Sequence, residues 1–269
     1  MLKRIMFLVT LVLLNLFPMQ DGCSAEPIRL RVLSYNIHHA EGVDRKLDLE
    51  RIAKVILSVE PDIVALQEVD QKVKRTQSVD QPAELARLTK MNVVFGANIE
   101  LQGGHYGNAV LSRFPITQQK NHLLPNVDNS EQRGVLEATL ELPESYKALL
   151  LYATHLDFRP ADEERLASAK MINELVAQHP DQPALLAGDL NATPNSQTLV
   201  QFRSAWTSVN EKPMATIPVD QPSRQIDFIL YRAQPRWKVI EVKVLDEAIA
   251  SDHRAIFAVL ELLPVSGQQ

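Results

Sequence analysis

Acidic, amide and imidazole side chains stand at the ends of short apolar runs in this sequence. Four runs are followed by such a residue and two are preceded by one. In chain order these residues are Asn36, Glu68, His155, Asp189, Asp227 and the neighbours Asp252 and His253. Carboxylates bind hard divalent cations, and a histidine beside a carboxylate can move a proton near neutral pH. The residue types therefore indicate metal-assisted acid–base chemistry.

The direction of the apolar runs decides whether these residues meet. The runs are Leu30–Tyr35, Ile63–Leu66, Leu149–Thr154, Ala184–Gly188, Phe228–Tyr231 and Ala255–Leu260. If the first four are strands of one direction and the last two run the other way, every polar residue falls on one edge of the fold. The pattern predicts a mixed sheet structure with an acid-and-histidine rim.

The segment Gly188-Asp189-Leu190-Asn191 carries an acid and an amide two residues apart. Side chains alternate in an extended chain, so Asp189 and Asn191 are expected to point the same way and to hold a metal, a water or a phosphate oxygen. The alternative is an Asx-type turn that caps a short helix after Pro194. The sequence leaves both interpretations open.

Asp227 lies between apolar residues, and a buried acid needs a partner. The natural partner is a histidine whose orientation the acid fixes, and the alternative is a structural pair with Arg224 or Arg232. Neighbouring side chains on a strand diverge, so we expect Asp252 to bind a metal and His253 to face the substrate.

The expected metal ligands are rich in oxygen. His38 and His39 follow Asn36, but there is no thiolate available and no helical histidine pair of the kind typical of zinc sites. Oxygen ligands favour Mg²⁺, with Mn²⁺ or Ca²⁺ as alternatives. We interpret His38 and His39 as substrate-side or structural residues.

The elements that position these residues are of two kinds. Amphipathic helices are predicted over residues 48–59, capped by Asp48, and over residues 161–178, with a short helix after Pro194. Alternating strands are predicted at 135–142 and at Ile240, Val242 and Val244, whereas 149–153 and 255–260 read as buried strands. This mixture predicts an α/β (α+β) sandwich of two mixed sheets packed face to face, with helices outside.

The beginning of the chain resembles a secretory signal. Lys3 and Arg4 precede an apolar stretch that ends at Pro18, and Cys23-Ser24-Ala25 forms a small-residue cleavage site. We expect residues 1–25 to be removed, which leaves one domain over residues 26–269 in a secreted or periplasmic protein. An uncleaved membrane anchor and acylation at Cys23 are the alternatives, in that order.

Charge and cysteine content restrict the function classes. The formal net charge of −5 gives no broad positive field for a nucleic-acid duplex, so a nucleic-acid substrate is not favoured. The densest basic stretch, residues 72–75, is interpreted as a solvated loop. Cys23 is the only cysteine, so the domain has no disulfide and must rely on packing or metal for rigidity.

Taken in order, the motifs resemble the endonuclease/exonuclease/phosphatase (DNase I-like) superfamily over nearly all of the expected mature chain. The matching segments are Tyr35-Asn36, Leu66-Gln67-Glu68-Val69, Gly107-Asn108-Ala109-Val110-Leu111-Ser112-Arg113, Thr154-His155-Leu156-Asp157, Gly188-Asp189-Leu190-Asn191, Ile226-Asp227 and Ser251-Asp252-His253. The resemblance implies a four-layer α/β sandwich and metal-dependent phosphoester hydrolysis.

The resemblance also implies roles for individual residues. A metal site is implied at Asn36, Glu68 and Asp252. Catalytic positions are implied at His253, Asp227, His155, Asp189 and Asn191, and phosphate contacts at Asn191, Arg133 and Asn108. His253 or Asp189 would take the proton of the attacking water. For Arg133 the alternative is a surface salt bridge.

We therefore expect a secreted phosphodiesterase that is active as a monomer on a lipid-like or small soluble phosphodiester, with membrane contact only through a lipid substrate. A secreted DNase I-like endonuclease, an inositol-phosphate phosphomonoesterase and a non-catalytic binding domain are the alternatives. The loops at 71–81 and 103–106 are expected to select the substrate.

Overall fold

The computed structural model describes residues 26–264, except 128, 144–145, 147 and 233–234. The predicted signal segment and its cleavage site at Cys23 lie outside these residues, so export stays a prediction from the sequence. None of the helices formed by the described residues has the length and apolar character needed to cross a membrane.

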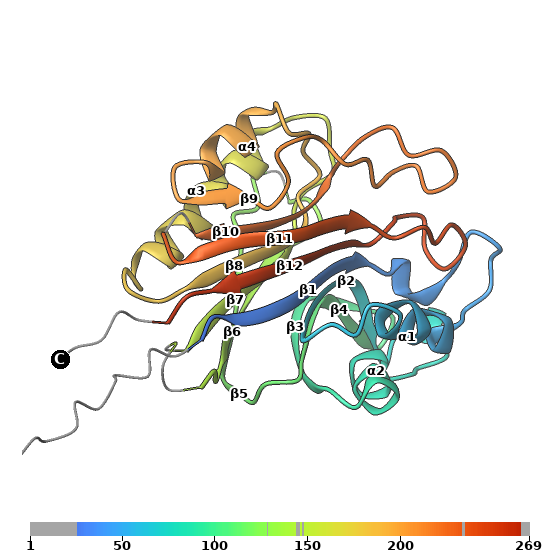
Figure 1. Ribbon diagram of the computed structural model, residues 1–269. Coiled ribbons are helices and arrows are strands. Elements are labelled where there is room, and N and C mark those ends of the chain that lie inside the picture. Colours follow the sequence, from blue (N-terminus) through green and yellow to red (C-terminus); the bar gives the residue numbers. More distant parts are fainter. Residues whose placement is uncertain (1–25, 128, 144–145, 147, 233–234, 265–269) are drawn as a thin grey trace, which may run out of the picture.

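Two mixed sheets of six strands each pack face to face (Figure 1). The first sheet has the order β11 (Trp237–Val244), β12 (Ile256–Leu262), β1 (Ile28–Asn36), β2 (Ile63–Gln71), β4 (Gly104–Ser112) and β3 (Asn92–Leu101). The second has the order β5 (Ile116–Leu123), β6 (Gly134–Leu140), β7 (Leu149–His155), β8 (Ala184–Asp189), β10 (Asp227–Arg232) and β9 (Trp206–Ser208).

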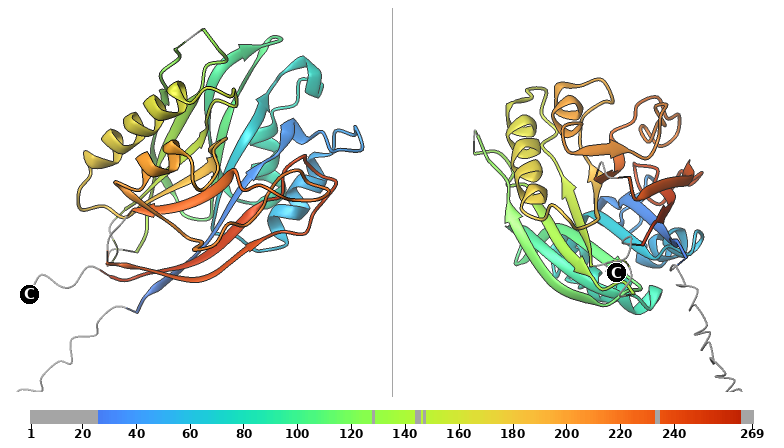
Figure 2. Two further views of the ribbon diagram at one scale, coloured as in Figure 1. Left: turned by 90° about the horizontal axis from the view of Figure 1, so that it is seen from above. Right: turned by 60° about the vertical axis from the view of Figure 1, so that its left-hand side comes forward.

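Helices cover the outer face of each sheet, as Figures 1 and 2 show. The elements are α1 (Leu49–Leu57) and α2 (Gln81–Thr89) on the first sheet, α3 (Glu163–Ala177) and α4 (Gln197–Phe202) on the second, and the short 3₁₀ turns η1 (His38–Ala40) and η2 (Lys74–Thr76). One apolar core lies between the sheets and one lies under each helical layer. The predicted four-layer α/β sandwich is confirmed.

Strand β1 shows how one strand serves two cores. Leu30 and Val32 face the second sheet, whereas Leu33 and Tyr35 pack under the helical layer. Both faces of the strand are therefore buried, which explains why it reads as a nearly continuous apolar run. Its polar residue Asn36 comes where the strand ends.

The predicted helices form with small differences at their ends. In α1 the Asp48 carboxylate accepts a hydrogen bond from the amide of Arg51, as expected of an N-cap. The helix predicted at 161–178 spans α3, and α4 is the short helix after Pro194. Helix α2 was not predicted, because its apolar stripe is interrupted and Leu85 is its main buried apolar side chain.

Strand directions agree with the prediction. Strands β1 and β2 are parallel neighbours, as are β7 and β8, while β12 is antiparallel to β1 and β10 is antiparallel to β8. The carboxyl ends of the four parallel strands and the beginnings of β10 and β12 therefore share one edge of the sandwich. The rim predicted from the sequence lies at this edge.

The alternation predicted for residues 240–244 is broken by a β-bulge in β11. The register with β12 shifts between Val239 and Glu241, so Ile240 turns outward and is 41% exposed. Val239, Val242 and Val244 pack on the central core instead. A bulge adds one residue to a strand and reverses the side-chain pattern beyond it, which the sequence alone does not reveal.

Gly188 allows β7 and β8 to approach closely just before the rim. Thr154 pairs with Gly188, and His155 pairs with Asp189 in the same parallel register. A Cβ atom at residue 188 would overlap the backbone carbonyl oxygen of Thr154. A larger residue would therefore force apart the two strands that carry His155 and Asp189.

We predict that Gly188→Ala lowers the free energy of unfolding by about 2–3 kcal/mol, because the overlap is with backbone that cannot rotate away. Urea denaturation measures this. Gly103→Ala is the control: its Cβ has open space, so only the positive φ of 84° costs stability, about 1 kcal/mol. Equal stability of the two variants would contradict the prediction.

Candidate active site

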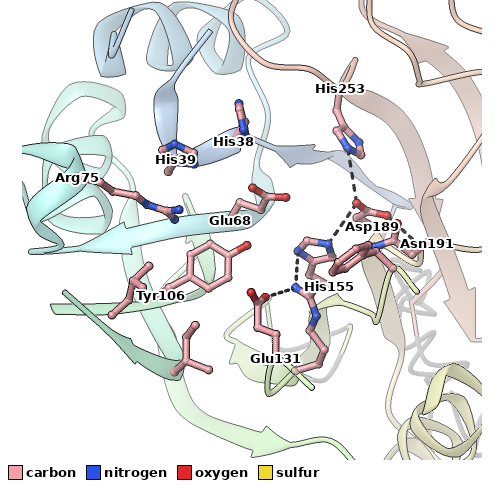
Figure 3. A pocket seen from close by; sticks show the side chains of 14 residues that line it. His38, His39, Glu68, Arg75, Tyr106, Glu131, His155, Asp189, Asn191 and His253 are labelled. Atoms are coloured by element: carbon pink, nitrogen blue, oxygen red, sulfur yellow. Dashed lines mark hydrogen bonds and ion pairs between the residues drawn. The ribbon is translucent and has the colours of Figure 1, made fainter. Parts of the chain in front are cut away.

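An open cavity of about 430 Å³ lies at the polar edge of the sandwich (Figure 3). Its lining residues are His38, His39, Glu68, Arg75, Ile99, Leu101, Tyr106, Glu131, Arg133, His155, Phe158, Asp189, Asn191 and His253. Both sheets contribute to it. The predicted residues Glu68, Arg133, His155, Asp189, Asn191 and His253 are thereby brought to one cavity.

The Asp189 carboxylate is the point where the site converges. His155 Nε2 lies 3.4 Å and His253 Nε2 lies 3.7 Å from its Oδ2. Asn36 Nδ2 donates to the same oxygen at 3.2 Å, and the amide of Asn191 donates to Oδ1 at 2.9 Å. Burial and the charge of Asp227 raise the pKa of Asp189 to about 7, against the opposing effect of His253 and the two hydrogen bonds.

His253 is oriented by Asp227, the acid that begins β10. Nδ1 lies 2.9 Å from Asp227 Oδ2, which directs Nε2 toward Asp189. Burial lowers the pKa of His253, but the charge and hydrogen bond of Asp227 and the charges of Asp189 and Asp252 together raise it to about 10. Arg224 and Arg232, the alternative partners of Asp227, make other contacts. The acid–histidine interpretation therefore describes Asp227 better than the ion pair with arginine.

His155 is oriented by Arg133. Arg133 Nη1 lies 3.2 Å from His155 Nδ1 and 2.8 Å from Glu131 Oε1. A guanidinium only donates, so Nδ1 accepts and Nε2 of the neutral ring carries the hydrogen toward Asp189. Burial lowers the pKa of His155 well below its usual value, and the charges of Arg133 and His253 lower it further. His155 is thus a neutral hydrogen-bond donor.

Glu68 reaches the cavity from a β-bulge in β2. The register with β4 shifts between Leu66 and Val69, and Glu68 adopts a φ of 59° although it is not glycine. Such strained positions are typical of functional sites, since the surrounding structure must hold them. Asn36 Nδ2 donates to Glu68 Oε1 at 3.0 Å. The bulge therefore directs the carboxylate toward Asn36, the residue that also contacts Asp189.

The surroundings of Glu68 fit a divalent cation. Burial raises the pKa of Glu68, the hydrogen bond from Asn36 lowers it, and the charge of the exposed Asp252 raises it again. Two carboxylates that repel each other form a donor set that a hard cation stabilises. Ligand atoms of His38 and His39 also lie within 4.8 Å of one another and of Glu68, which adds nitrogen donors to the expected oxygen set.

Asn36 presents its nitrogen, not its oxygen, to the carboxylates. Its Oδ1 accepts a hydrogen bond from the backbone amide of His38 at 3.1 Å, while Nδ2 contacts Glu68 and Asp189. In this orientation Asn36 positions the two acids, and its predicted role as a metal ligand stays a prediction. The side chain is fully buried at the end of β1.

Asn191 does not extend strand β8 as the alternation predicted. The strand ends at Asp189, and Asn191 has a φ of 46°, so its amide folds back to the Asp189 carboxylate. This is an Asx-type turn, but it does not cap the helix after Pro194 as the alternative expected, because the side chain of Ser196 caps α4. Asn191 nevertheless lines the cavity, and its Nδ2 donates to the Leu156 carbonyl oxygen at 3.0 Å. Its contact with a metal, a water or a phosphate stays a prediction.

The phosphate contact predicted for Asn108 stays a prediction. Asn108 is buried in β4 and is absent from the residues that line the cavity. Its Nδ2 donates to the Gly134 carbonyl oxygen at 3.0 Å, which links β4 of the first sheet to β6 of the second. The residue therefore has a structural position between the two sheets.

Sequence patterns missed the outer part of the cavity. Arg75 is held by the fully buried Asp70 through hydrogen bonds from Nε and Nη2, both of 2.8 Å, so the basic stretch at 72–75 is not only a solvated loop. Tyr106 and Phe158 were also missed. Arg75 and Tyr106 nevertheless lie in the two segments expected to select the substrate, although Tyr106 belongs to strand β4 and not to a loop, and Phe158 follows the His155-Leu156-Asp157 motif.

Comparisons with known proteins agree with this geometry. The model of the endonuclease/exonuclease/phosphatase family matches residues 33–253. The uncharacterized protein YbhP of Escherichia coli K12 is 33% identical over 213 residues, which cover 74% of this chain and 83% of YbhP. Nocturnin of Mus musculus is 27% identical over 220 residues, which cover 71% of this chain and 50% of nocturnin.

A solved structure shows the same architecture. The endonuclease/exonuclease/phosphatase of Beutenbergia cavernae superposes with a TM-score of 0.72 at 26% sequence identity. The match covers 87% of this chain and 72% of the other. The likeness therefore extends across both sheets and across the edge that holds the cavity.

We predict that millimolar Mn²⁺ or Mg²⁺ raises the melting temperature, because a ligand that binds only the folded state stabilises it by about 2.7 kcal/mol at 100 times its Kd. Glu68→Gln should remove most of this shift, since the carboxylate is lost while size is kept. Differential scanning calorimetry measures both.

Glu131→Gln is the matched control, because Glu131 lines the same cavity but forms an ion pair with Arg133. It should keep the cation-dependent shift. A wild-type protein that neither cation stabilises, or a Glu68→Gln variant with the full shift, would contradict the metal site.

Proposed function

Since the chain belongs to the endonuclease/exonuclease/phosphatase family and is thereby a metal-dependent phosphoester hydrolase, we propose that it hydrolyses a small soluble phosphodiester by direct attack of water. The observation that carries this proposal is the convergence of two oriented histidines on one carboxylate. His155 and His253 each use Nδ1 for a fixed partner and turn Nε2 toward Asp189.

The attacking water needs a group that takes its proton. Asp189 and His253 form the proton-accepting pair: the Asp189 carboxylate takes the proton, and His253, which Asp227 holds in place and whose raised pKa keeps it protonated near neutral pH, lies beside it. A proton acceptor must lie within hydrogen-bond reach of the water, and both groups face the same cavity. Their shared position supports a single water-binding point between them and the phosphate.

The phosphate needs donors that stabilise its negative charge. The neutral His155 donates from Nε2, and Arg133 carries a fixed positive charge beside it. Arg133 lines the cavity, and its buried Nε has no protein partner among the described residues. Fixed donors of this kind stabilise the transition state more than the ground state.

Mg²⁺ is the proposed cofactor. Glu68, positioned with the help of Asn36, and the nearby Asp252 would hold it together with waters, in keeping with the incomplete protein shells that Mg²⁺ prefers. When bound, the cation neutralises charge on the phosphoryl and leaving oxygens. Mn²⁺ is the alternative that the nearby His38 and His39 favour.

The cavity supports a small soluble substrate over a lipid. Charged groups from Arg75, Glu131 and Arg133 lie among its apolar side chains. An acyl chain would have to pass these charges, and desolvating them without partners is costly. The acidic net charge continues to disfavour long nucleic acids, so a secreted endonuclease ranks second.

We predict that His253→Gln lowers kcat for bis(p-nitrophenyl) phosphate by about 10²–10⁴-fold, the usual contribution of acid–base catalysis. Asp227→Asn should lower kcat less, because His253 remains but loses its orienting charge. Release of p-nitrophenolate with Mg²⁺ measures both variants.

His179→Gln is the control. His179 forms an ion pair with Glu137 in a different pocket and should keep wild-type kcat. The same assay should include plasmid DNA, RNA, sphingomyelin and inositol phosphates. Near-wild-type turnover by His253→Gln on every substrate would refute the roles, and DNA cleavage at low protein concentration would reverse the substrate ranking.

A further inference from the structure

Phe158 is an exposed aromatic residue at the mouth of the cavity. It is 67% exposed, whereas Phe202, Phe228 and Phe257 are almost fully buried. The ring contributes little to the cores, yet it lines the cavity beside His155 and Arg133. Phe158 therefore lies at the cavity and outside the three apolar cores.

The backbone on both sides of Phe158 is clamped. Buried Arg165, from α3, donates from one nitrogen, Nη1, to the carbonyl oxygens of Asp157 at 2.8 Å and Arg159 at 2.6 Å. Arg159 Nε contacts both carboxylate oxygens of buried Asp157 at 3.0 Å, and its Nη2 donates to Glu164 at 2.8 Å. The segment is thus fixed although its central side chain is exposed.

A fixed, exposed ring offers a rigid surface to a ligand. Ordering a loop costs conformational entropy, and a pre-ordered aromatic binds its partner without that cost. The Arg133 guanidinium lies 5.9 Å from the centre of the Phe158 ring, which joins the ring to the phosphate-side residues. Phe158 therefore lies next to a residue proposed to bind the phosphate, where an ester group of a bound phosphodiester would be attached.

The other walls of the cavity indicate the chemistry of that ester group. Tyr106, Ile99 and Leu101 supply apolar contacts, but Arg75 and Glu131 lie among them. A flexible acyl chain would find no continuous apolar wall. A flat heteroaromatic ring with polar edges, such as a nucleobase, can use the Phe158 face and the charged side chains together.

We infer that Phe158 is a specificity-determining residue that stacks on a flat heteroaromatic ring, such as a nucleobase, on the ester arm that stays attached to the phosphate after hydrolysis. The inference rests on the proposed phosphodiesterase function and narrows its substrate class. Phe158 touches neither the phosphate nor the proton-accepting pair, so its removal should weaken binding of the aromatic arm and leave the chemical step intact.

The test compares two substrates that release the same product. Thymidine 5′-(p-nitrophenyl phosphate) carries a base on the retained arm, and methyl p-nitrophenyl phosphate carries none. Loss of one stacked base reduces binding by about 5- to 100-fold. Phe158→Ala should therefore raise KM for the thymidine ester by that factor with little change in kcat, and should change kcat/KM for the methyl ester less than about twofold.

Companion variants separate aromatic stacking from general packing. Phe158→Tyr should keep the wild-type KM for the thymidine ester, whereas Phe158→Leu should raise this KM nearly as much as Phe158→Ala does. Ile240→Ala, at an exposed position of β11, is the control for surface substitution and should leave KM and kcat unchanged for both substrates. An equal loss of kcat/KM by Phe158→Ala on both esters would overturn the inference. So would a wild-type KM of Phe158→Leu for the thymidine ester.

A binding measurement keeps this test apart from the proposed function. If wild-type protein hydrolyses neither ester, the proposed function fails, and isothermal titration with thymidine 5′-monophosphate and methyl phosphate still tests Phe158. The inference predicts tighter binding of the thymidine compound, lost in Phe158→Ala. Equal affinity of Phe158→Ala and wild type for the thymidine compound would refute it.

Discussion

The buried Asp189 carboxylate is the constraint on which the rest of the site depends. A charged carboxylate that is 2% exposed must be compensated by donors, or the fold loses stability. Here the compensating groups come from four separate parts of the chain: hydrogen-bond donors at the end of β1 and in the turn after β8, and imidazoles at the end of β7 and in the segment before β12. Satisfying one acid therefore assembles the residues proposed to catalyse the reaction.

Asn36 joins the two halves of the molecule. It ends β1 in the first sheet, and its Nδ2 lies between Glu68 Oε1 at 3.0 Å and Asp189 Oδ2 at 3.2 Å. Glu68 belongs to the first sheet and Asp189 to the second, so one amide spans the proposed metal side and the proposed proton-accepting side. Sliding of one sheet over the other would break this link, and the Gly188 contact in β8 keeps the second sheet in register.

The sequence was sufficient to predict the two-sheet architecture and the residues of the acid-and-histidine rim. Strand ends, helix caps and burial follow from local patterns, so Asp48, Asp189 and His253 could be placed in advance. The bulge at Glu68, the left-handed turn at Asn191 and the outward rotation of Ile240 could not, because each is a backbone irregularity imposed by neighbouring strands.

The residues of the outer cavity could not be predicted from the sequence, for a different reason. Arg75 and Phe158 come from loops whose positions depend on distant partners, Asp70 and Arg165, and no periodicity reports such contacts. Asn108 shows the converse, since a residue within a family motif occupies a structural position between the sheets. The sequence motifs therefore indicated the residues at the centre of the site, whereas the residues of the outer cavity became evident only from the tertiary structure.

We propose that the Asp189 carboxylate organises catalysis without being needed to hold the cation. Turnover of methyl p-nitrophenyl phosphate by Asp189→Asn in Mg²⁺ tests this proposal, because the substitution keeps the shape of the side chain and removes its charge. We expect a loss of kcat of at least about 10²-fold, the lower bound for acid–base groups, with the Mg²⁺-dependent rise in melting temperature retained. Turnover close to that of the wild type would contradict it.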